Sequence, residues 1–168
     1  MRNIFLVGFM GSGKSTVASY LAEKYGMEII EMDQQIVERE GMSIPDIFEQ
    51  KGESYFREAE TNLLIDMQGV ENKVVSCGGG VVLREQNVKE MKKSGTIIFL
   101  NAKPETILER VKDDDNRPLL RGNKNVEFIS DMMRERKPKY EGAADITIHT
   151  DEKSADAICK EIIEKVGE

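Results

Sequence analysis

A glycine-rich segment near the beginning of the chain carries side chains that could bind a nucleotide. Residues 8–16 read Gly-Phe-Met-Gly-Ser-Gly-Lys-Ser-Thr and fit the phosphate-binding pattern G-x-x-x-x-G-K-[ST]. Glycines let successive backbone N–H groups converge on one anion, Lys14 adds a positive charge for the terminal phosphates, and Ser15 offers a hydroxyl to Mg²⁺. A chance glycine-rich turn is the alternative. The apolar run at 4–7 and the helical pattern at 14–25 give the strand-to-helix context of the motif, so we expect a nucleoside triphosphate with magnesium.

Two carboxylates end the second apolar run. Residues 27–33 read Met-Glu-Ile-Ile-Glu-Met-Asp and predict a strand with Glu31 and Asp33 on one face and Met32 on the other. Ligands of an open parallel sheet bind beyond the carboxyl ends of its strands, so we expect both acids beside the phosphate loop. They are candidates for magnesium and substrate contacts. Two solvated acids at a strand end would give the same pattern.

A glycine triplet and an arginine suggest a second binding region. Gly78–Gly80 directly follow an expected strand at 73–77, where glycines let the backbone approach a ligand closely. A flexible turn is the alternative, but the position at the same sheet edge as the phosphate loop favours a place in the site. Arg57 lies in a helical stretch and is either an exposed surface charge or a planar fork for a carboxylate.

A polar segment late in the chain predicts a mobile lid. Residues 113–125 lack periodicity, and long loops in compact domains are often functional. A kinase needs a closing segment that excludes water, and Arg117 within this one would stabilise the transferring phosphoryl group. Arg110, near the end of the preceding helix, either stacks on a nucleotide base or favours the helix dipole.

The elements that must position these residues alternate along the chain. Five strands are predicted, at 4–7, 27–33, 73–77, 96–100 and 146–148. Helices are predicted at 14–25, over 34–69 with breaks at Gly41 and Gly52, at 81–93, from Pro104, at 126–136 and from Ser154. The helical insertion after the second strand can act as a small substrate-binding subdomain.

Composition and charge exclude several classes of protein. The 168 residues, 39% hydrophobic and 33% charged, indicate one globular domain, and no apolar run is long enough to cross a membrane. Because Met1 leads straight into the first strand without a signal peptide, we expect a cytoplasmic location. The net charge of −7 argues against nucleic-acid binding, including by the basic cluster at 134–139. Cys77 and Cys159 fit neither a disulfide framework nor a metal site, and with no apolar face left over we expect a monomer.

The order of the motifs resembles the shikimate kinase family over nearly the whole chain. The matching segments are the phosphate loop, Asp33, Phe56-Arg57 with Glu60, Gly78–Gly80, and Arg117-Pro118-Leu119-Leu120 ahead of Arg136-x-Pro138-x-Tyr140. The resemblance implies an α/β fold of the P-loop nucleoside-monophosphate-kinase type, a three-layer α/β/α sandwich around a five-stranded parallel sheet. It also implies a single kinase domain over 1–168, with a substrate-binding insertion at about 34–62 and a mobile lid at about 113–125.

The resemblance further implies an activity and a set of roles. Members transfer the γ-phosphoryl group of ATP to the 3-hydroxyl of shikimate in chorismate and aromatic amino acid biosynthesis, with Mg²⁺ as cofactor. Carried over by position, the catalytic residues are Asp33, Lys14 and Arg117. ATP would contact Gly11, Ser12, Gly13, Lys14, Ser15, Thr16, Arg110 and Arg117, with Ser15 as the magnesium ligand. Shikimate would contact Asp33, Arg57, Gly79, Gly80 and Arg136, the two arginines holding its carboxylate.

Two positions depart from the family pattern, and three other functions stay open. Glu31 stands where members commonly have aspartate, and Cys77 stands where many have threonine. The first alternative is a kinase of the same fold acting on a nucleoside monophosphate or gluconate. The second is a GTPase-type switch, whose D-x-x-G element is matched only by residues 66–69 inside a helical pattern. The third is a non-catalytic module that binds shikimate.

Overall fold

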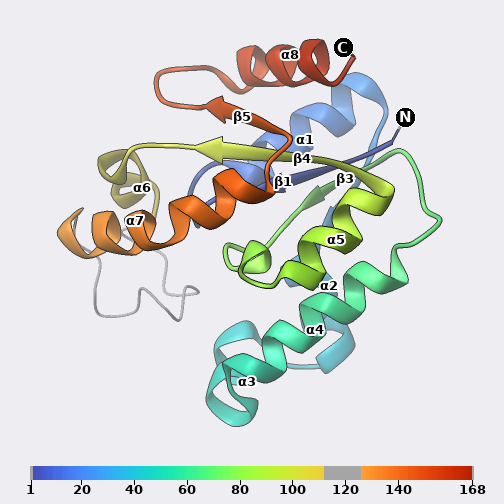
Figure 1. Ribbon diagram of the computed structural model, residues 1–168, viewed down its shortest axis with the longest axis vertical. Coiled ribbons are helices and arrows are strands. Elements are labelled where there is room, and N and C mark those ends of the chain that lie inside the picture. Colours follow the sequence, from blue (N-terminus) through green and yellow to red (C-terminus); the bar gives the residue numbers. More distant parts are fainter. Residues whose placement is uncertain (1, 112–125, 168) are drawn as a thin grey trace.

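The computed structural model describes residues 2–111 and 126–167, which build a parallel sheet with helices on both faces (Figure 1). The strands are β1 (Asn3–Val7), β2 (Glu28–Glu31), β3 (Lys73–Ser76), β4 (Gly95–Asn101) and β5 (Ile146–His149), in the order β2-β3-β1-β4-β5 with every neighbouring pair parallel. The helices are α1 (Lys14–Tyr25), α2 (Met32–Glu40), α3 (Ile44–Lys51), α4 (Glu53–Asp66), the 3-10 helix η1 (Val81–Leu83), α5 (Glu85–Ser94), α6 (Pro104–Val111), α7 (Val126–Ala143) and α8 (Ala155–Val166).

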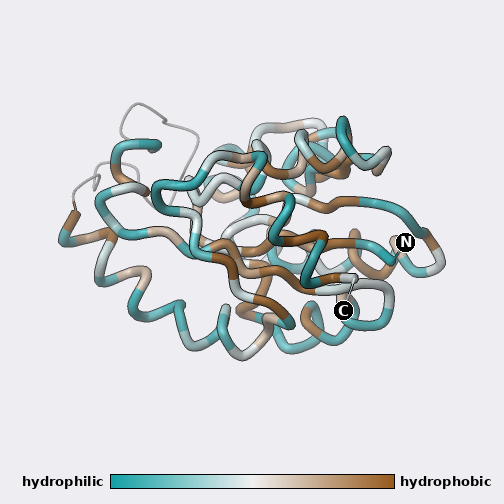
Figure 2. Tube along the Cα trace, turned by 90° about the horizontal axis from the view of Figure 1, so that it is seen from above, coloured by the Kyte–Doolittle hydropathy of each residue, from teal (hydrophilic) through white to brown (hydrophobic). Residues whose placement is uncertain are grey.

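The central strand β1 separates two hydrophobic clusters. Phe5 and Val7 point into one cluster and Ile4 and Leu6 into the other, as the alternation of a strand requires. Helices α1 and α8 supply the second cluster, whereas α4, α5 and α7 cover the opposite face of the sheet (Figure 1). Hydrophobic residues run through the middle of the molecule and hydrophilic ones lie mostly outside (Figure 2). The predicted three-layer α/β/α sandwich with a five-stranded parallel sheet is therefore confirmed.

The sheet brings three strand ends to one edge. Glu31 at the end of β2 is in register with Ser76 at the end of β3, and Ser76 is in register with Leu6 of β1. The phosphate loop follows β1 and the glycine triplet follows β3, so both leave the sheet at this carboxyl edge. The expected placement of the two loops side by side follows from this topology.

Helices α2, α3 and α4 form the predicted insertion after β2, and the chain breaks where the sequence indicates. Gly41 ends α2 with a φ of 70°, in the left-handed region that glycine adopts readily. Ser43 begins α3, and its side chain accepts a hydrogen bond from the backbone N–H of Asp46 at 3.2 Å. Helix α4 starts directly after Gly52 and carries Arg57 on its buried side.

The second strand is shorter than predicted. It ends at Glu31, and Asp33 lies in the first turn of α2, so the two acids do not share one face of a strand. The chain passes from strand to helix without a glycine or proline, and Met32 is fully buried at the junction. Local patterning could not locate this boundary because no turn residue marks it.

Helix α7 is longer than predicted. The sequence pattern ends it at Arg136, since Pro138 lacks an N–H group and disfavours a helical residue before it. The helix instead continues through Pro138 to Ala143. Tyr140 and Ala143 are buried beyond the proline, and packing of this last stretch stabilises the continuation.

The helix predicted at 81–93 is two elements in the structure, η1 and α5.

The predicted lid at 113–125 and its Arg117 lie outside the described residues. Within residues 2–111 and 126–167, no helix has both the length and the apolar character needed to cross a membrane.

Candidate active site

The phosphate loop joins β1 to α1 in a tight curl. A Cβ on Gly8, whose φ is 153°, would lie 2.5 Å from the carbonyl oxygen of Leu100, so only glycine fits there. Lys14 folds back over the loop, and its Nζ donates to the carbonyl oxygens of Gly8 at 2.7 Å and Phe9 at 3.2 Å. The loop thus places a cation at the N-terminus of a helix, where an anion is favoured.

A small group of oxygen atoms lies beside the loop. The Ser15 hydroxyl donates to Glu31 Oε2 at 3.2 Å, and its Oγ lies 3.4 Å from Ser76 Oγ. Hydroxyl and carboxylate oxygens are the hard ligands that Mg²⁺ prefers, and Mg²⁺ typically keeps few protein ligands. The side chain of Glu31 reaches Ser15, so the departure from aspartate keeps a carboxylate at this point. The residues present therefore fit a magnesium ion held jointly with phosphate.

Arg57 is buried beside the glycine triplet. Its side chain is 9% exposed, and Nη1 donates to Glu60 Oε1 at 2.9 Å, one turn further along α4. A Cβ on Gly80 would lie 2.5 Å from the guanidinium atoms, so the absence of a side chain at Gly80 leaves room for the arginine. The alternative that Arg57 is an exposed surface charge is wrong.

Glu60 is a buried carboxylate to which the sequence assigned no role. It is fully buried, and Oε2 has no hydrogen-bond partner within the part of the chain that the structure describes. Burial raises the pKa of Glu60 to about 7, although the neighbouring Arg57 guanidinium acts in the opposite direction. A glutamate one helical turn after a motif arginine was the signal that could have identified it.

Asp33 faces Glu60 across Gly78. A Cβ on Gly78 would lie 3.1 Å from Asp33 Oδ1 and 2.7 Å from Glu60 Oε2, so two carboxylates flank the bare backbone of this glycine. Asp33 comes from α2 and Glu60 from α4, and the insertion after β2 thus supplies both. The first glycine of the triplet lies where the carboxylates converge.

Arg136 and Tyr140 approach the triplet from α7. Arg136 is 8% exposed, its guanidinium lies 5.8 Å from the ring centre of Phe9, and among the described residues its buried Nη1 finds no hydrogen-bond partner. A Cβ on Gly79 would lie 3.7 Å from that Nη1. Tyr140, one turn after Arg136, donates from its hydroxyl to the Gly79 carbonyl oxygen. Burial raises the pKa of Tyr140 to about 12, so the hydroxyl stays protonated and remains a donor.

A cavity of about 470 Å³ lies along the phosphate loop and reaches Asp33 and Gly79. Its lining includes the phosphate loop, Asp33, Cys77, Gly79, Arg110 and Lys153. Arg110 also donates to the Gly11 carbonyl oxygen at 2.9 Å. The volume and the polar lining of the cavity fit a nucleotide whose phosphates lie at the loop, beside a second substrate near Gly79.

Comparison with known proteins identifies this architecture. The family model described as shikimate kinase matches residues 10–167 of the chain. The chain belongs to the shikimate kinase family. It is 48% identical over 166 residues to the shikimate kinase of Persephonella marina, with 99% of each chain covered.

Solved structures of shikimate kinases have the same fold. The enzyme of Acinetobacter baumannii in complex with shikimate matches with a TM-score of 0.93 at 35% identity, covering 99% of this chain and 93% of that chain. The enzyme of Aquifex aeolicus matches with a TM-score of 0.83 at 41% identity, covering 98% and 96%. Membership of the family makes the chain an ATP-dependent kinase with the fold of the nucleoside monophosphate kinases.

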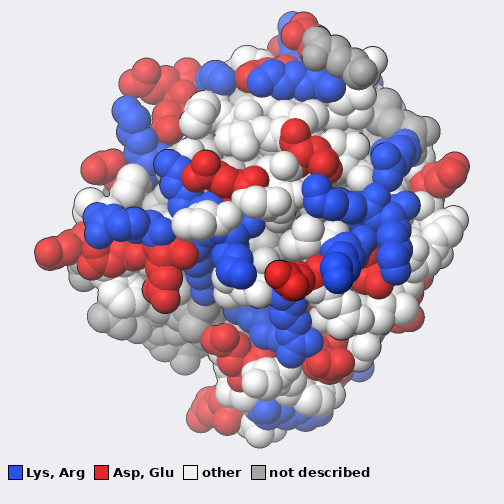
Figure 3. Space-filling model, in the orientation of Figure 1, with Lys and Arg blue, Asp and Glu red and all other residues white. Residues whose placement is uncertain are grey.

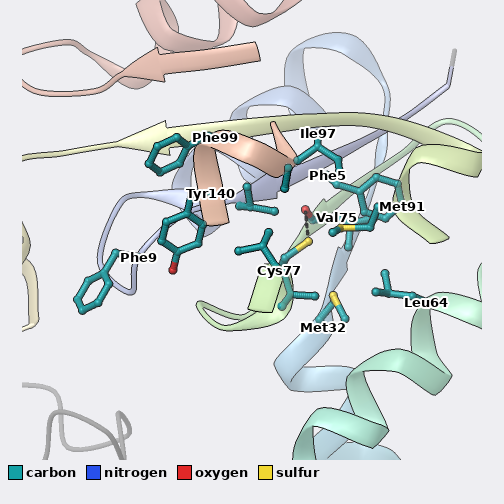
Figure 4. Close-up of a cluster of buried hydrophobic side chains, with 14 of the residues drawn as sticks. Phe5, Phe9, Met32, Leu64, Val75, Cys77, Met91, Ile97, Phe99 and Tyr140 are labelled. Atoms are coloured by element: carbon teal, nitrogen blue, oxygen red, sulfur yellow. Dashed lines mark hydrogen bonds between the residues drawn. The ribbon is translucent and has the colours of Figure 1, made fainter. Parts of the chain in front are cut away.

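Most site residues predicted for a shikimate kinase come together in the structure. The cavity is lined by Gly11, Ser12, Gly13, Lys14, Ser15, Thr16, Asp33, Gly79 and Arg110. Gly80, Arg57 and Arg136 do not line this cavity but lie directly behind its glycine-rich end. Arg117 lies outside the described residues. Cys77 is a core residue whose Sγ donates to the Val75 carbonyl oxygen (Figure 4), and burial raises the pKa of its thiol.

Proposed function

We propose that the protein transfers the γ-phosphoryl group of ATP to the 3-hydroxyl of shikimate, giving shikimate 3-phosphate and ADP for chorismate and aromatic amino acid biosynthesis. The observation that carries this proposal is the pair of buried arginines beside the glycine triplet. Arg136 keeps a buried N–H without a partner among the described residues, which favours an anionic ligand there. A planar carboxylate fits two guanidinium groups, and shikimate offers one.

The nucleotide end acts through charge. Lys14, which bonds to carbonyl oxygens of its own loop, would turn to the β- and γ-phosphates when ATP binds. Ser15 and Glu31 would hold Mg²⁺, which neutralises developing charge on the phosphate oxygens. Gly11, Ser12, Gly13 and Thr16 would contact the phosphates, and Arg110 would lie against the adenine.

The acceptor end acts through position. Arg57 and Arg136 would hold the carboxylate of shikimate, while the backbone of Gly79 and Gly80 contacts its ring. Asp33 would orient the attacking hydroxyl and accept its proton. Phosphoryl transfer through a loose transition state depends on positioning more than on a strong base, so an ordinary carboxylate suffices.

We further propose that residues 1–168 work as one kinase domain. The insertion at about 34–62 would carry Arg57 to the carboxylate of shikimate, and the lid at about 113–125 would bring Arg117 to the γ-phosphate. We propose a cytoplasmic monomer that binds neither membrane nor nucleic acid. Two buried free thiols support a reducing compartment, and acidic and basic groups are interspersed over the face shown in Figure 3.

The test is ADP release from the purified protein with magnesium and ATP. Shikimate should stimulate release, whereas AMP and gluconate should not, and Asp33→Asn should abolish the stimulation. Glu38→Gln, a change at an exposed carboxylate on the same helix α2, is the matched control and should keep it. Stimulation by AMP or gluconate in place of shikimate would assign the protein to another acceptor.

A further inference from the structure

A second cavity of about 390 Å³ lies behind the phosphate loop. It is bounded by the ends of β4 and β5, by the beginning of α6 and by the middle of α7. It shares no lining residue with the cavity that holds the phosphate loop. Its volume falls within the range of about 300–1,000 Å³ that is typical of small-molecule sites. We call it the α7 cavity.

Aromatic rings form the floor of the α7 cavity. Phe99 and Tyr140 are stacked with ring centres 5.0 Å apart, and Phe9 completes the floor. The three lie together at one end of the core cluster in Figure 4. Met133 and Pro104 add apolar walls. The three rings are only 2–3% exposed, so a flat apolar occupant would lie over them and pack mainly against the more accessible Met133 and Pro104.

The rim of the α7 cavity is cationic. Lys103, Arg134 and Lys137 line it, all three exposed. In the part of the chain that is described, the side chains of Lys103 and Lys137 form no ion pair, and Arg134 has only a long, exposed one with Asp131 at 3.4 Å. This local positive charge contrasts with the net charge of −7 for the whole chain.

One carboxylate lines the α7 cavity, and it is already engaged. Asp151 Oδ1 accepts hydrogen bonds from the Lys103 backbone N–H at 3.0 Å and from the Thr106 hydroxyl at 2.9 Å. It holds the start of α6 in place and offsets part of the charge of Lys103, leaving Arg134 and Lys137. The cavity thus combines an apolar floor with a net positive charge at its mouth, three cations against one carboxylate.

We propose that the α7 cavity binds a small organic anion, in which a carboxylate or sulfonate is attached to an aromatic body. The aromatic body would pack against Met133 and Pro104 above the buried rings, and the anionic group would meet Lys103, Arg134 and Lys137 at the rim. The two cavities share no lining residue, although Tyr140 in the floor of this one bonds to Gly79 of the other, so the test keeps the kinase site occupied.

The test uses 2-naphthalenesulfonate as the probe and isothermal titration calorimetry on the full chain. Saturating ADP, magnesium and shikimate are present throughout to occupy the kinase site. One probe molecule should bind per chain, and uncharged 2-naphthalenemethanol should bind about tenfold more weakly or not at all. No binding at millimolar probe, or binding only when ADP and shikimate are omitted, would overturn the proposal.

Two lysines on α7 offer a matched pair of variants. Lys137 lines the cavity, whereas Lys139 is exposed on the same helix and does not line it. Lys137→Glu should weaken the probe about tenfold or more, and Lys139→Glu should change its affinity by less than about twofold. Arg134→Glu, two turns before Tyr140, should repeat the loss. If Lys137→Glu and Lys139→Glu weakened the probe equally, its affinity would depend only on the net charge of the protein, and the proposed site would be refuted.

Discussion

The two ends of the candidate active site are built in different ways. The nucleotide end comes mostly from one continuous segment, residues 8–16, in which Lys14 bonds to carbonyl oxygens of its own loop. The acceptor end is assembled from α2, α4, α7 and the glycine triplet, and its ionic groups are buried against one another. Substitutions at the first end should therefore remove catalysis alone, whereas substitutions at the second should also change stability or local geometry.

The largest expected effect is at the nucleotide end. Lys14→Ala should lower kcat by about 10³-fold, because it removes the positive charge that we propose turns to the transferring phosphoryl group. The free energy of unfolding should change by less than about 1 kcal/mol, since the hydrogen bonds of Lys14 to the carbonyl oxygens of Gly8 and Phe9 join it to the phosphate loop and not to another element. Steady-state ADP release and urea unfolding measure the two quantities. Lys24→Ala, at an exposed residue of the same helix, should leave kcat unchanged. A large loss of stability in Lys14→Ala would show that substitutions at the nucleotide end, like those at the acceptor end, also affect folding.

The next largest effect concerns the acceptor end and the pH dependence of stability. The ordinary pKa of Glu60 is 4.5, and burial raises it to about 7 in the folded protein. Between these values the folded state binds more protons than the unfolded state, so the contribution of Glu60 to stability is fully present below the lower value and is lost as the pH rises through the upper one. The loss should approach about 3 kcal/mol.

Glu60→Gln tests this dependence. Urea unfolding between about pH 5 and pH 8 should show that wild-type protein loses stability relative to the variant as the pH rises. Glu58→Gln changes an exposed glutamate on the same helix and should run parallel to the wild type over that window. Parallel curves for Glu60→Gln and wild type would mean that Glu60 is ionised in the folded protein at all these pH values.

A smaller effect on the KM for shikimate tests whether the position of the Arg57 guanidinium matters at the acceptor end, since Gly80→Ala moves this group and keeps its charge. Gly80→Ala places a Cβ where the Arg57 guanidinium lies, so the arginine must move. The KM for shikimate should rise about tenfold, because a displaced guanidinium would lose the carboxylate contact that we propose for it, while the KM for ATP stays within about twofold. Gly142→Ala is the control, since a Cβ there meets nothing within 4 Å. Equal rises in both KM values would show that the triplet serves the nucleotide as well.

The same contrast explains what the sequence could predict. The strands and the phosphate loop are local, because contiguous apolar runs and a continuous motif specify them. The burial of Arg57, the raised pKa of Glu60 and the partner of Tyr140 arise only when α4 and α7 pack on the glycine triplet. Motif spacing named Arg57 as a candidate but left its exposure open.

The wrong boundaries have the same origin. Pro138 predicts the end of a helix from local chemistry, yet the burial of Tyr140 beyond it keeps the chain helical. Asp33 was predicted to extend a strand, and the buried Met32 starts a helix instead. In both places, packing between distant segments outweighs the local preference, so the acceptor end is where sequence reasoning is weakest.

The smallest expected effect tests whether α7 positions the triplet. Tyr140→Phe removes the hydroxyl that donates to the Gly79 carbonyl oxygen and keeps the ring stacked on Phe99. The lost hydrogen bond should cost about 1 kcal/mol of stability. If the bond also holds Gly79 against shikimate, the KM for shikimate should rise about threefold to fivefold with an unchanged KM for ATP. Tyr55→Phe, at a partly exposed hydroxyl bonded to Glu40, is the control and should leave both KM values unchanged. A stability loss without any change in the shikimate KM would confine Tyr140 to packing and leave the positioning of Gly79 to the sheet edge alone.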